Sequence, residues 1–209
     1  MASFVKEQNP EIFILMLLFK KIVMENVISF LNRLHSLPPA LIAELRQVLQ
    51  YTRKRKNEWL VREGEICKYA WYLQKGLVRC YYNRNQREAT TWFMEEDNII
   101  SLSKSLFRQT ESKYNLDALE DCELYRIRYE DIMHVLEKYS EARRIGAIIA
   151  EKYSNLKDIR IRATSMLIAK ERYRYFEKHF PHLLNRVKLE YIASYLDLSR
   201  RSLARARGF

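Results

Sequence analysis

Three arginines close to the C-terminal end of the sequence, Arg200, Arg201 and Arg205, have the spacing of one helix face. The opposite side of the same stretch carries Leu203 and Ala206, so the arginines point away from the apolar side. A guanidinium group can donate two parallel hydrogen bonds to O6 and N7 of guanine in the major groove of DNA. The pattern therefore favours a helix suited to reading base edges. The alternative is an ordinary helical hairpin with a solvated arginine face.

The residues before and within this stretch fit the pattern of two helices joined by a tight turn. The pattern needs small and apolar residues where the helices cross, a turn residue that accepts the left-handed conformation, and an N-cap for the second helix. These roles fall, in order, on Ile192, Ala193, Leu196, Asp197, Leu198, Ser199, Leu203 and Ala206. Asp197 takes the turn and Ser199 the N-cap. Lys188, Ser199 and Ser202 are suited to contacting phosphates. The sequence therefore predicts a helix-turn-helix.

The net charge is concentrated in the same part of the chain. The 209 residues include 37 Lys and Arg and 26 Asp and Glu, a formal net charge of +11. Residues 144–209 hold 15 of the basic and 6 of the acidic residues, a net of +9, and residues 1–143 hold the remaining +2. A hydrophobic content of 48% excludes a disordered basic tail. A localised basic excess meets the electrostatic condition for binding a polyanion.

A long helix is expected immediately before this region. Between Glu141 and Lys170 the sequence has no proline, and apolar residues recur at heptad spacing. We expect a seam that packs on a partner helix, with candidate seam residues Ile145, Ile149, Leu156, Ile159 and Ala163. Packing of the stripe against the helix's own domain is the open alternative.

The first two thirds of the sequence predict two short helices followed by strands. Residues 27–34 and 41–49 have helical periodicity, with a break at residues 36–39. Short β-branched and aromatic segments follow, divided by polar turns in which Gly64 and Gly76 tolerate positive φ. The strand segments are 59–61, 70–73, 77–82, 90–93 and 124–127. They indicate a sandwich, barrel or rolled sheet.

An apolar run, residues 12–19 (IFILMLLF), precedes these elements and is too short to span a membrane. We interpret residues 1–23 as an N-terminal appendage. An amphipathic helix that packs on the body is an alternative, and a membrane anchor is the least favoured interpretation.

The residue types that carry catalysis or bind metals do not form a recognisable pattern. The three cysteines, Cys67, Cys80 and Cys122, are widely spaced, which predicts reduced thiols rather than disulfides, zinc ligands or an iron–sulfur site. The four histidines do not have metal-ligand spacing. We therefore predict no metal, no cofactor and no enzymatic activity, and a cytoplasmic location without membrane contact.

Taken together, these patterns resemble the Crp/Fnr family of bacterial transcription regulators over residues 24–209. The stretch 166–207 is the most specific part and looks like the branch found in Bacteroidetes-type bacteria, and REGE at 62–65 and YLQKG at 72–76 resemble turns of the family's cyclic-nucleotide-binding-like β-roll. The resemblance implies an α+β fold: an N-terminal antiparallel β-roll with flanking helices, a long dimerisation helix and a C-terminal helix-turn-helix. The last unit is winged-helix-like with the wing absent or truncated, since two residues follow Arg207. The expected regions are 1–23 (appendage), 24–140 (β-roll effector domain), 141–168 (dimerisation helix) and 169–209 (DNA-binding domain).

The resemblance also implies a function. It implies a homodimer bound to a pseudo-palindromic site on double-stranded DNA, with half-sites roughly 34 Å apart, and RNA polymerase as a further partner. The family's base-reading positions fall on Arg200, Arg201 and Arg205, the second of which is usually acidic in the cyclic-AMP receptor type.

The sensor region departs from the cyclic-AMP-binding members. They carry a G-E-L-(small)-L cassette followed by R-(S/T)-A, and neither occurs in residues 98–117. A lysine, as a flexible point charge, does not replace the planar fork of the arginine. The predicted effector pocket uses Ile100, Ser101, Leu102, Lys104, Lys113 and Asn115. We expect an unknown effector, and no tight binding of cyclic AMP. The alternative function is an effector-binding module that regulates a protein partner, with a hairpin that does not bind DNA.

Overall fold

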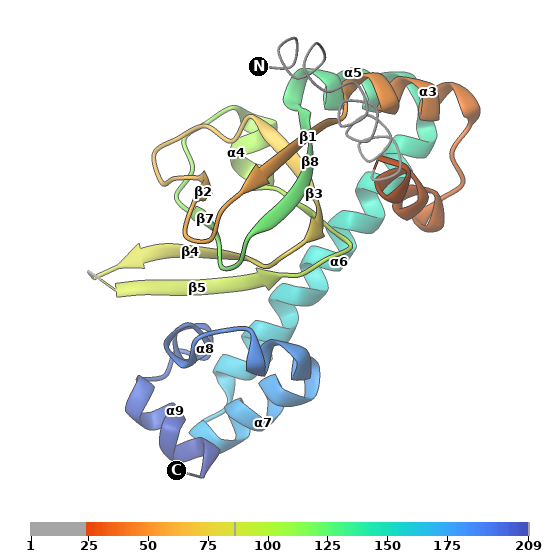
Figure 1. Ribbon diagram of the computed structural model, residues 1–209. Coiled ribbons are helices and arrows are strands. Elements are labelled where there is room, and N and C mark those ends of the chain that lie inside the picture. Colours follow the sequence, from red (N-terminus) through yellow and green to blue (C-terminus); the bar gives the residue numbers. More distant parts are fainter. Residues whose placement is uncertain (1–23, 86, 209) are drawn as a thin grey trace, which may run out of the picture.

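The computed structural model describes residues 24–85 and 87–208 (Figure 1). The predictions on residues 1–23 lie outside the described residues. The described part begins with a helix of residues 24–34, followed by α3 (Pro39–Val48). The break between them falls where Pro38 and Pro39 predicted it, because a proline at the first helical position costs no intrahelical hydrogen bond. Among the described helices, none is long and apolar enough to cross a membrane.

Eight strands form two antiparallel sheets. The strands are β1 (Gln50–Lys54), β2 (Trp59–Val61), β3 (Tyr69–Lys75), β4 (Val78–Arg84), β5 (Arg87–Met94), β6 (Asn98–Ile100), β7 (Asn115–Ala118) and β8 (Cys122–Arg128). The strand order is β1-β8-β3-β6 in one sheet and β2-β7-β4-β5 in the other. All five predicted strand segments are confirmed as β2, β3, β4, β5 and β8. Gly64 and Gly76 have φ of 86° and 104°, as their turns required.

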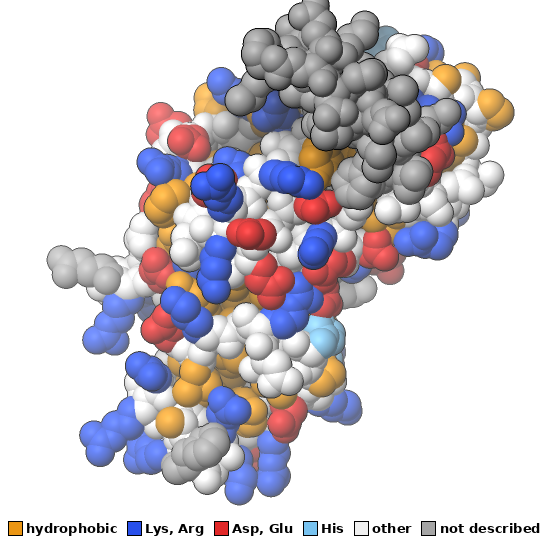
Figure 2. Space-filling model, in the orientation of Figure 1, with side chains coloured by type: hydrophobic (Ala, Val, Ile, Leu, Met, Phe, Trp, Pro, Cys, Tyr) orange, Lys and Arg blue, Asp and Glu red, His pale blue; other side chains and the backbone are white. Residues whose placement is uncertain are grey.

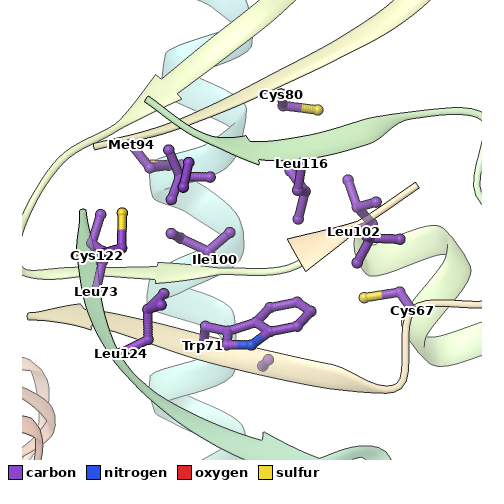
Figure 3. Close-up of a cluster of buried hydrophobic side chains, with 14 of the residues drawn as sticks. Cys67, Trp71, Leu73, Cys80, Met94, Ile100, Leu102, Leu116, Cys122 and Leu124 are labelled. Carbon is purple, nitrogen blue, oxygen red and sulfur yellow. The ribbon is translucent and has the colours of Figure 1, made fainter. Parts of the chain in front are cut away.

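The two sheets enclose a continuous apolar interior (Figure 3). Trp71 and Leu73 from β3 point inward and meet Ile100 from β6 and Leu116 from β7. Tyr72, between the two inward residues, packs on the other side of the sheet against the helix of residues 24–34 and α3. Strand β3 is therefore buried on both faces, and the sheet that contains it lies between the interior and a helical layer.

Two helices follow the sheets and one of them runs the length of the molecule. A short helix α4 (Ser103–Arg108) lies between β6 and β7, and α5 (Tyr129–Lys138) follows β8. Helix α6 (Ser140–Ser165) then extends past the β-roll toward the C-terminal helices (Figure 1). This order of β-roll, long helix and C-terminal helices confirms the predicted α+β fold class.

Helix α6 uses its apolar stripe within the protomer. Ile145 and Ile149 pack in the cluster beneath the N-terminal helices, Leu156 packs on the β-roll interior, and Ala163 lies in the C-terminal core. Ile145 is 6% exposed and Ala163 is fully buried, so the stripe covers three successive cores of its own chain. Ile145 and Ala163 are therefore covered by their own chain, whereas Ile149, Leu156 and Ile159 keep part of their surface exposed, and the dimer seam stays a prediction. Heptad spacing alone does not distinguish a stripe that packs on a partner helix from one that packs on its own chain.

The C-terminal helices form a small unit at the end of α6. They are α7 (Ala169–His179), a 3₁₀ segment (Pro181–Asn185), α8 (Leu189–Tyr195) and α9 (Arg200–Arg207). Their core includes Leu77, Phe93 and Leu119, which belong to the β-roll. The unit is thus packed onto the roll as well as onto α6.

Candidate nucleic-acid interface

Helices α8 and α9 are joined by a tight turn with the predicted geometry. Asp197 has φ of 53°, the left-handed conformation expected of the turn residue. The Leu198 amide donates to the Ala193 carbonyl at 2.9 Å and closes the turn. Ile192, Leu196 and Leu203 are at most 1% exposed and fill the space between the helices. The apolar positions identified in the sequence therefore hold the two helices together.

The start of α9 is capped as predicted. The Ser199 hydroxyl accepts a hydrogen bond from the Ser202 amide at 3.0 Å and lies 2.8 Å from the Ser202 hydroxyl. A further contact was not predicted from the sequence: the Arg172 guanidinium donates to the carbonyls of Leu196, at 3.0 Å, and Met166, at 2.7 Å. It fastens the turn to the end of α6. An arginine in the amphipathic α7 gave no local signal of this role.

The three arginines that the sequence singled out are all exposed. Arg200, Arg201 and Arg205 project from α9 on the side away from buried Leu203, and none of them has an ion-pair partner among the described residues. Lys188 is also exposed, at the start of α8, 3.7 Å from Glu190. Figure 2 shows Lys and Arg side chains around the lower part of the molecule, which contains the C-terminal helices. Such a surface can donate hydrogen bonds to base edges and phosphates at once.

Helix α8 is held against the edge of the β-roll. The Ser194 hydroxyl accepts from the Thr90 amide at 2.9 Å and donates to the Glu88 carbonyl at 2.6 Å. Both partners lie on β5, which is an edge strand of its sheet. A side chain from the C-terminal unit thus satisfies backbone groups that an edge strand leaves unpaired. Helix α8 faces the roll, and α9 stays free.

A buried arginine completes this contact from the roll side. Arg79 on β4 is 2% exposed and forms two hydrogen bonds with Asp117, at 3.0 and 2.8 Å, and one with Glu88 at 2.6 Å. Its guanidinium carbon lies 4.0 Å from the Tyr81 ring centroid and 3.8 Å from that of Tyr191 in α8. Burial alone lowers the pKa of Arg79, but the two carboxylates outweigh it and the pKa is raised. The charge is therefore retained inside the contact.

A second arginine, in the C-terminal unit, contacts the β-roll. Arg186, just after the 3₁₀ segment, donates to Glu96 at 2.8 and 2.9 Å, to Glu120 at 2.8 and 3.0 Å, and to the Gly76 carbonyl at 3.1 Å. The hydrogen bonds to Glu120 and Glu96 raise the pKa of Arg186. Since both carboxylates lie in loops of the roll, the arginine fixes the C-terminal unit to them.

The predicted effector residues do not gather around one pocket. Ile100 and Leu102 are part of the apolar interior, and Asn115 is buried with its amide oxygen accepting from the Glu63 backbone. Lys104 and Lys113 are exposed. Ser101 alone of the six lines the large cavity described below. Residues that are close in sequence around β6, α4 and β7 therefore point in different directions.

Tyr153 is a sensor-side residue that the sequence did not reveal. Its hydroxyl donates to the Ile99 carbonyl at 2.8 Å and lies 3.2 Å from the Ser101 amide, which donates to it. Burial raises the pKa of this phenol above its usual range. The tyrosine therefore links α6 to the segment where cyclic-nucleotide-binding members hold the phosphate.

The cysteines offer no reactive group. All three thiols are free and buried, and burial raises the pKa of Cys80 to about 12 and that of Cys122 to about 11. Among the described residues, no group of three or more His, Cys, Asp and Glu side chains is arranged to hold a metal ion.

The sequence of the roll matches a known domain family. Residues 52–139 match the profile of the cyclic nucleotide-binding domain. A comparison with curated proteins found no match.

Solved structures share the fold over most of the chain. One is a regulator of the Crp/Fnr family from Eubacterium rectale (16% identity, TM-score 0.66, covering 81% of this chain and 82% of that one). Another is the c-di-GMP-responsive regulator CLP from Xanthomonas campestris (17% identity, TM-score 0.64, 81% and 89%). A third is FixK2 from Bradyrhizobium japonicum (16% identity, TM-score 0.62, 77% and 83%). The chain therefore shares the fold of these regulators, and its β-roll is similar to the cyclic nucleotide-binding domain. The assignment to the Bacteroidetes-type branch stays a prediction.

Proposed function

We propose that the chain is a sequence-specific DNA-binding transcription regulator that acts as a homodimer and has no enzymatic activity. The observation that carries the proposal is the exposed, unpaired arginine face of α9, held in place by a capped start and a fixed turn. The Crp/Fnr neighbours described as transcriptional regulators support it. Arg200, Arg201 and Arg205 contact base edges, and Lys188, Ser199 and Ser202 contact phosphates.

The experiment selects a preferred duplex from a random DNA pool and measures affinity for it by fluorescence anisotropy. Replacing Arg200, Arg201 and Arg205 by Ala should weaken binding by at least about 100-fold, since each good arginine–guanine pair discriminates by roughly 1–3 kcal/mol. Binding by the unchanged chain should also fall by orders of magnitude between about 50 and 200 mM salt.

A matched control removes the same charge elsewhere. Arg84, Arg87 and Arg108 are exposed on the β-roll, and their replacement by Ala should leave the sequence preference intact. Equal loss in both triple variants would show a nonspecific charge effect and overturn the assignment of α9. Equal affinity of the α9 variant and the unchanged chain would overturn it as well.

A homodimer needs a surface of α6 that the cores of its own protomer leave exposed. Ile148 and Ile159 lie on the side of α6 that its own cores leave partly exposed, and we assign the partner helix to this side. Replacing both by Asp should shift the sedimentation coefficient from dimer to monomer. Lys157→Asp, an exposed position on another side of the same helix, is the control. A monomer in the unchanged chain, free and on DNA, would contradict the dimer.

The β-roll takes an effector other than cyclic AMP. Side chains of Ile100, Leu102 and Leu106 fill the interior beside the β6–α4 segment, and the R-(S/T)-A motif is missing from residues 98–117. Isothermal titration with cyclic AMP should therefore give no heat of tight binding. A micromolar or tighter dissociation constant would contradict this assignment without affecting the assignment of α9.

A further inference from the structure

A large apolar cavity lies on the outer side of the β1-β8-β3-β6 sheet. It has a volume of about 430 Å³ and is walled by the helix of residues 24–34, α3, α5, α6, and the loop before α4. Trp71, Leu41, Ile132 and Ile149 are among its lining residues, and the polar exceptions are few, chiefly Ser101, Ser103 and tyrosine side chains. Phe107, which is 48% exposed, stands at its rim.

An apolar cavity of this size is expected to bind an apolar group. The cavity is partly open to solvent, and its lining is almost entirely apolar. Filling it with water would leave the apolar lining hydrated, which is unfavourable in proportion to its area. The cavity borders the β-roll interior at Trp71 and Leu106, but most of its lining comes from the helices and from the outer face of the sheet.

The chain itself carries an apolar segment next to this cavity. Residues 12–19, IFILMLLF, are eight consecutive apolar residues, and an exposed run of this kind also needs cover. Five residue steps separate Phe19 from Met24, a distance of at most about 18 Å. Met24 packs against the cluster that walls the cavity, and Val27 and Leu31 in the same helix line it. The chain therefore enters the described part beside the cavity.

We propose that residues 12–19 dock into this cavity of the same chain. The two apolar surfaces cover each other, and the short connection gives the segment a high effective concentration, in the millimolar range, which an outside ligand must exceed. Charged residues flank the run, Glu11 before it and Lys20 and Lys21 after it, so its ends can stay in water. Ala142, Gly146 and Ile149 of α6 line one wall, so the docked segment braces the helix that leads to the C-terminal unit.

Disulfide trapping in the full-length chain tests the proposal. Each of residues 12–19 is replaced in turn by Cys, together with Ala142→Cys in the cavity wall. The three native thiols are buried and do not compete. Mild oxidation should give an intrachain disulfide at a subset of the eight positions. The matched control is Ala147→Cys, which is exposed on α6 and does not line the cavity, and it should give none.

Each other outcome identifies another occupant and overturns the proposal. Disulfides that form only between chains would place a second copy in the cavity. An apolar compound that co-purifies in equal amount with the unchanged chain, without intrachain trapping, would place a small molecule there. Equal trapping with both wall positions would show a mobile segment rather than a docked one.

A second variant measures the same contact without an added thiol. Leu15→Asp with Leu18→Asp in the full-length chain should open the cavity to an apolar fluorescent dye that the unchanged chain excludes, and should lower the melting temperature. The β-roll should keep its near-ultraviolet circular dichroism, because neither residue belongs to its interior. Unchanged dye binding and melting temperature would contradict docking.

Discussion

The β-roll and the C-terminal unit build their cores in different ways. The roll encloses an interior that its own strands largely supply, with Trp71, Leu73, Ile100 and Leu116 meeting between the sheets. The C-terminal unit has about 40 residues, a size at which a chain rarely buries enough apolar surface to fold alone. Its core is completed by Leu77, Phe93 and Leu119 of the roll. The unit that we assign to DNA is therefore stabilised by the region that we assign to sensing.

This difference can be tested at two adjacent residues on β5 that face opposite ways. Phe93 packs with Phe176 and Tyr195 of the C-terminal unit, at ring-centroid distances of 6.5 and 5.7 Å, whereas Met94 packs in the roll interior. Phe93→Ala should cost about 3–5 kcal/mol and Met94→Ala about 2–5 kcal/mol. Hydrogen exchange should then speed up in α7, α8 and α9 for the first variant and in the strands for the second. The same exchange pattern in both variants would contradict the separate cores.

Loss of the buried ion pair of Arg79 should have the next largest effect on stability. Arg79→Met leaves Asp117 buried without its partner, which should cost about 3 kcal/mol, at the lower end of the range because Glu88 is 45% exposed. The measurement is a denaturant titration of the full chain.

A second variant tests whether the unpaired charge on Asp117 causes this loss of stability. Arg79→Met combined with Asp117→Leu removes both charges, so it should be more stable than Arg79→Met alone. If the double variant is the less stable of the two, the loss in Arg79→Met does not come from an uncompensated charge on Asp117.

The sequence predicted the C-terminal unit better than the rest, for a local reason. The turn at Asp197 and the cap at Ser199 depend on residues a few positions away, so a single sequence contains their signals. The strands β6 and β7, of three and four residues, were missed because they are short and contain Asn, Asp and Ala, which are depleted in strands. The stripe of α6 was recognised, but its use depends on what packs against it, and Ile145 and Ala163 proved to be covered by their own chain.

The contacts that join the β-roll to α6 and to the C-terminal unit were harder to predict because they depend on long-range placement. Tyr153 reaches Ile99 and Ser101 across more than fifty residues, and Arg186 reaches Glu96 across ninety. Neither contact has a spacing that a sequence pattern could reveal. Sequence position also placed Ile100 and Lys104 in one pocket, although one is buried and the other is exposed.

The contact of the two regions should also depend on pH. Burial raises the pKa of Glu96, but hydrogen bonds from Arg186 and from the Gly76 and Glu96 backbone outweigh it, so the pKa is lowered on folding. The stabilisation is thus present above the unfolded value of about 4.3 and is lost as pH falls through the lowered value. The coupling of Glu96 with Arg186 should be about 1 kcal/mol, since both side chains are partly exposed.

Thermal unfolding between pH 6 and pH 3 measures this dependence. Glu96→Gln should remove its part of the pH dependence, and Glu111→Gln serves as the control, since Glu111 is exposed on the roll and has no ion-pair partner among the described residues. An unchanged pH profile in Glu96→Gln would show that the carboxylate does not link the regions.

The smallest expected effect separates the stability of α9 from its proposed contact with DNA. Ser199→Ala removes the cap on the Ser202 amide and should cost about 1 kcal/mol. Ser199→Asp keeps a capping oxygen and adds a charge that favours a helix N-terminus, so stability should be retained. The same negative charge would repel a phosphate at this position. The Asp variant should therefore melt like the unchanged chain and bind the selected duplex more weakly.

Melting and anisotropy measured on the same two variants decide between the roles of Ser199. If the Ala variant loses stability and the Asp variant loses only affinity, the hydroxyl both caps α9 and faces DNA. If Asp197→Asn, an exposed change two positions away that removes a negative charge, strengthens binding by about as much as Ser199→Asp weakens it, the effect is one of general charge. Because the start of α9 is exposed whereas α8 is held against the roll, a local effect at Ser199 would place DNA on the side of the unit that the roll leaves free.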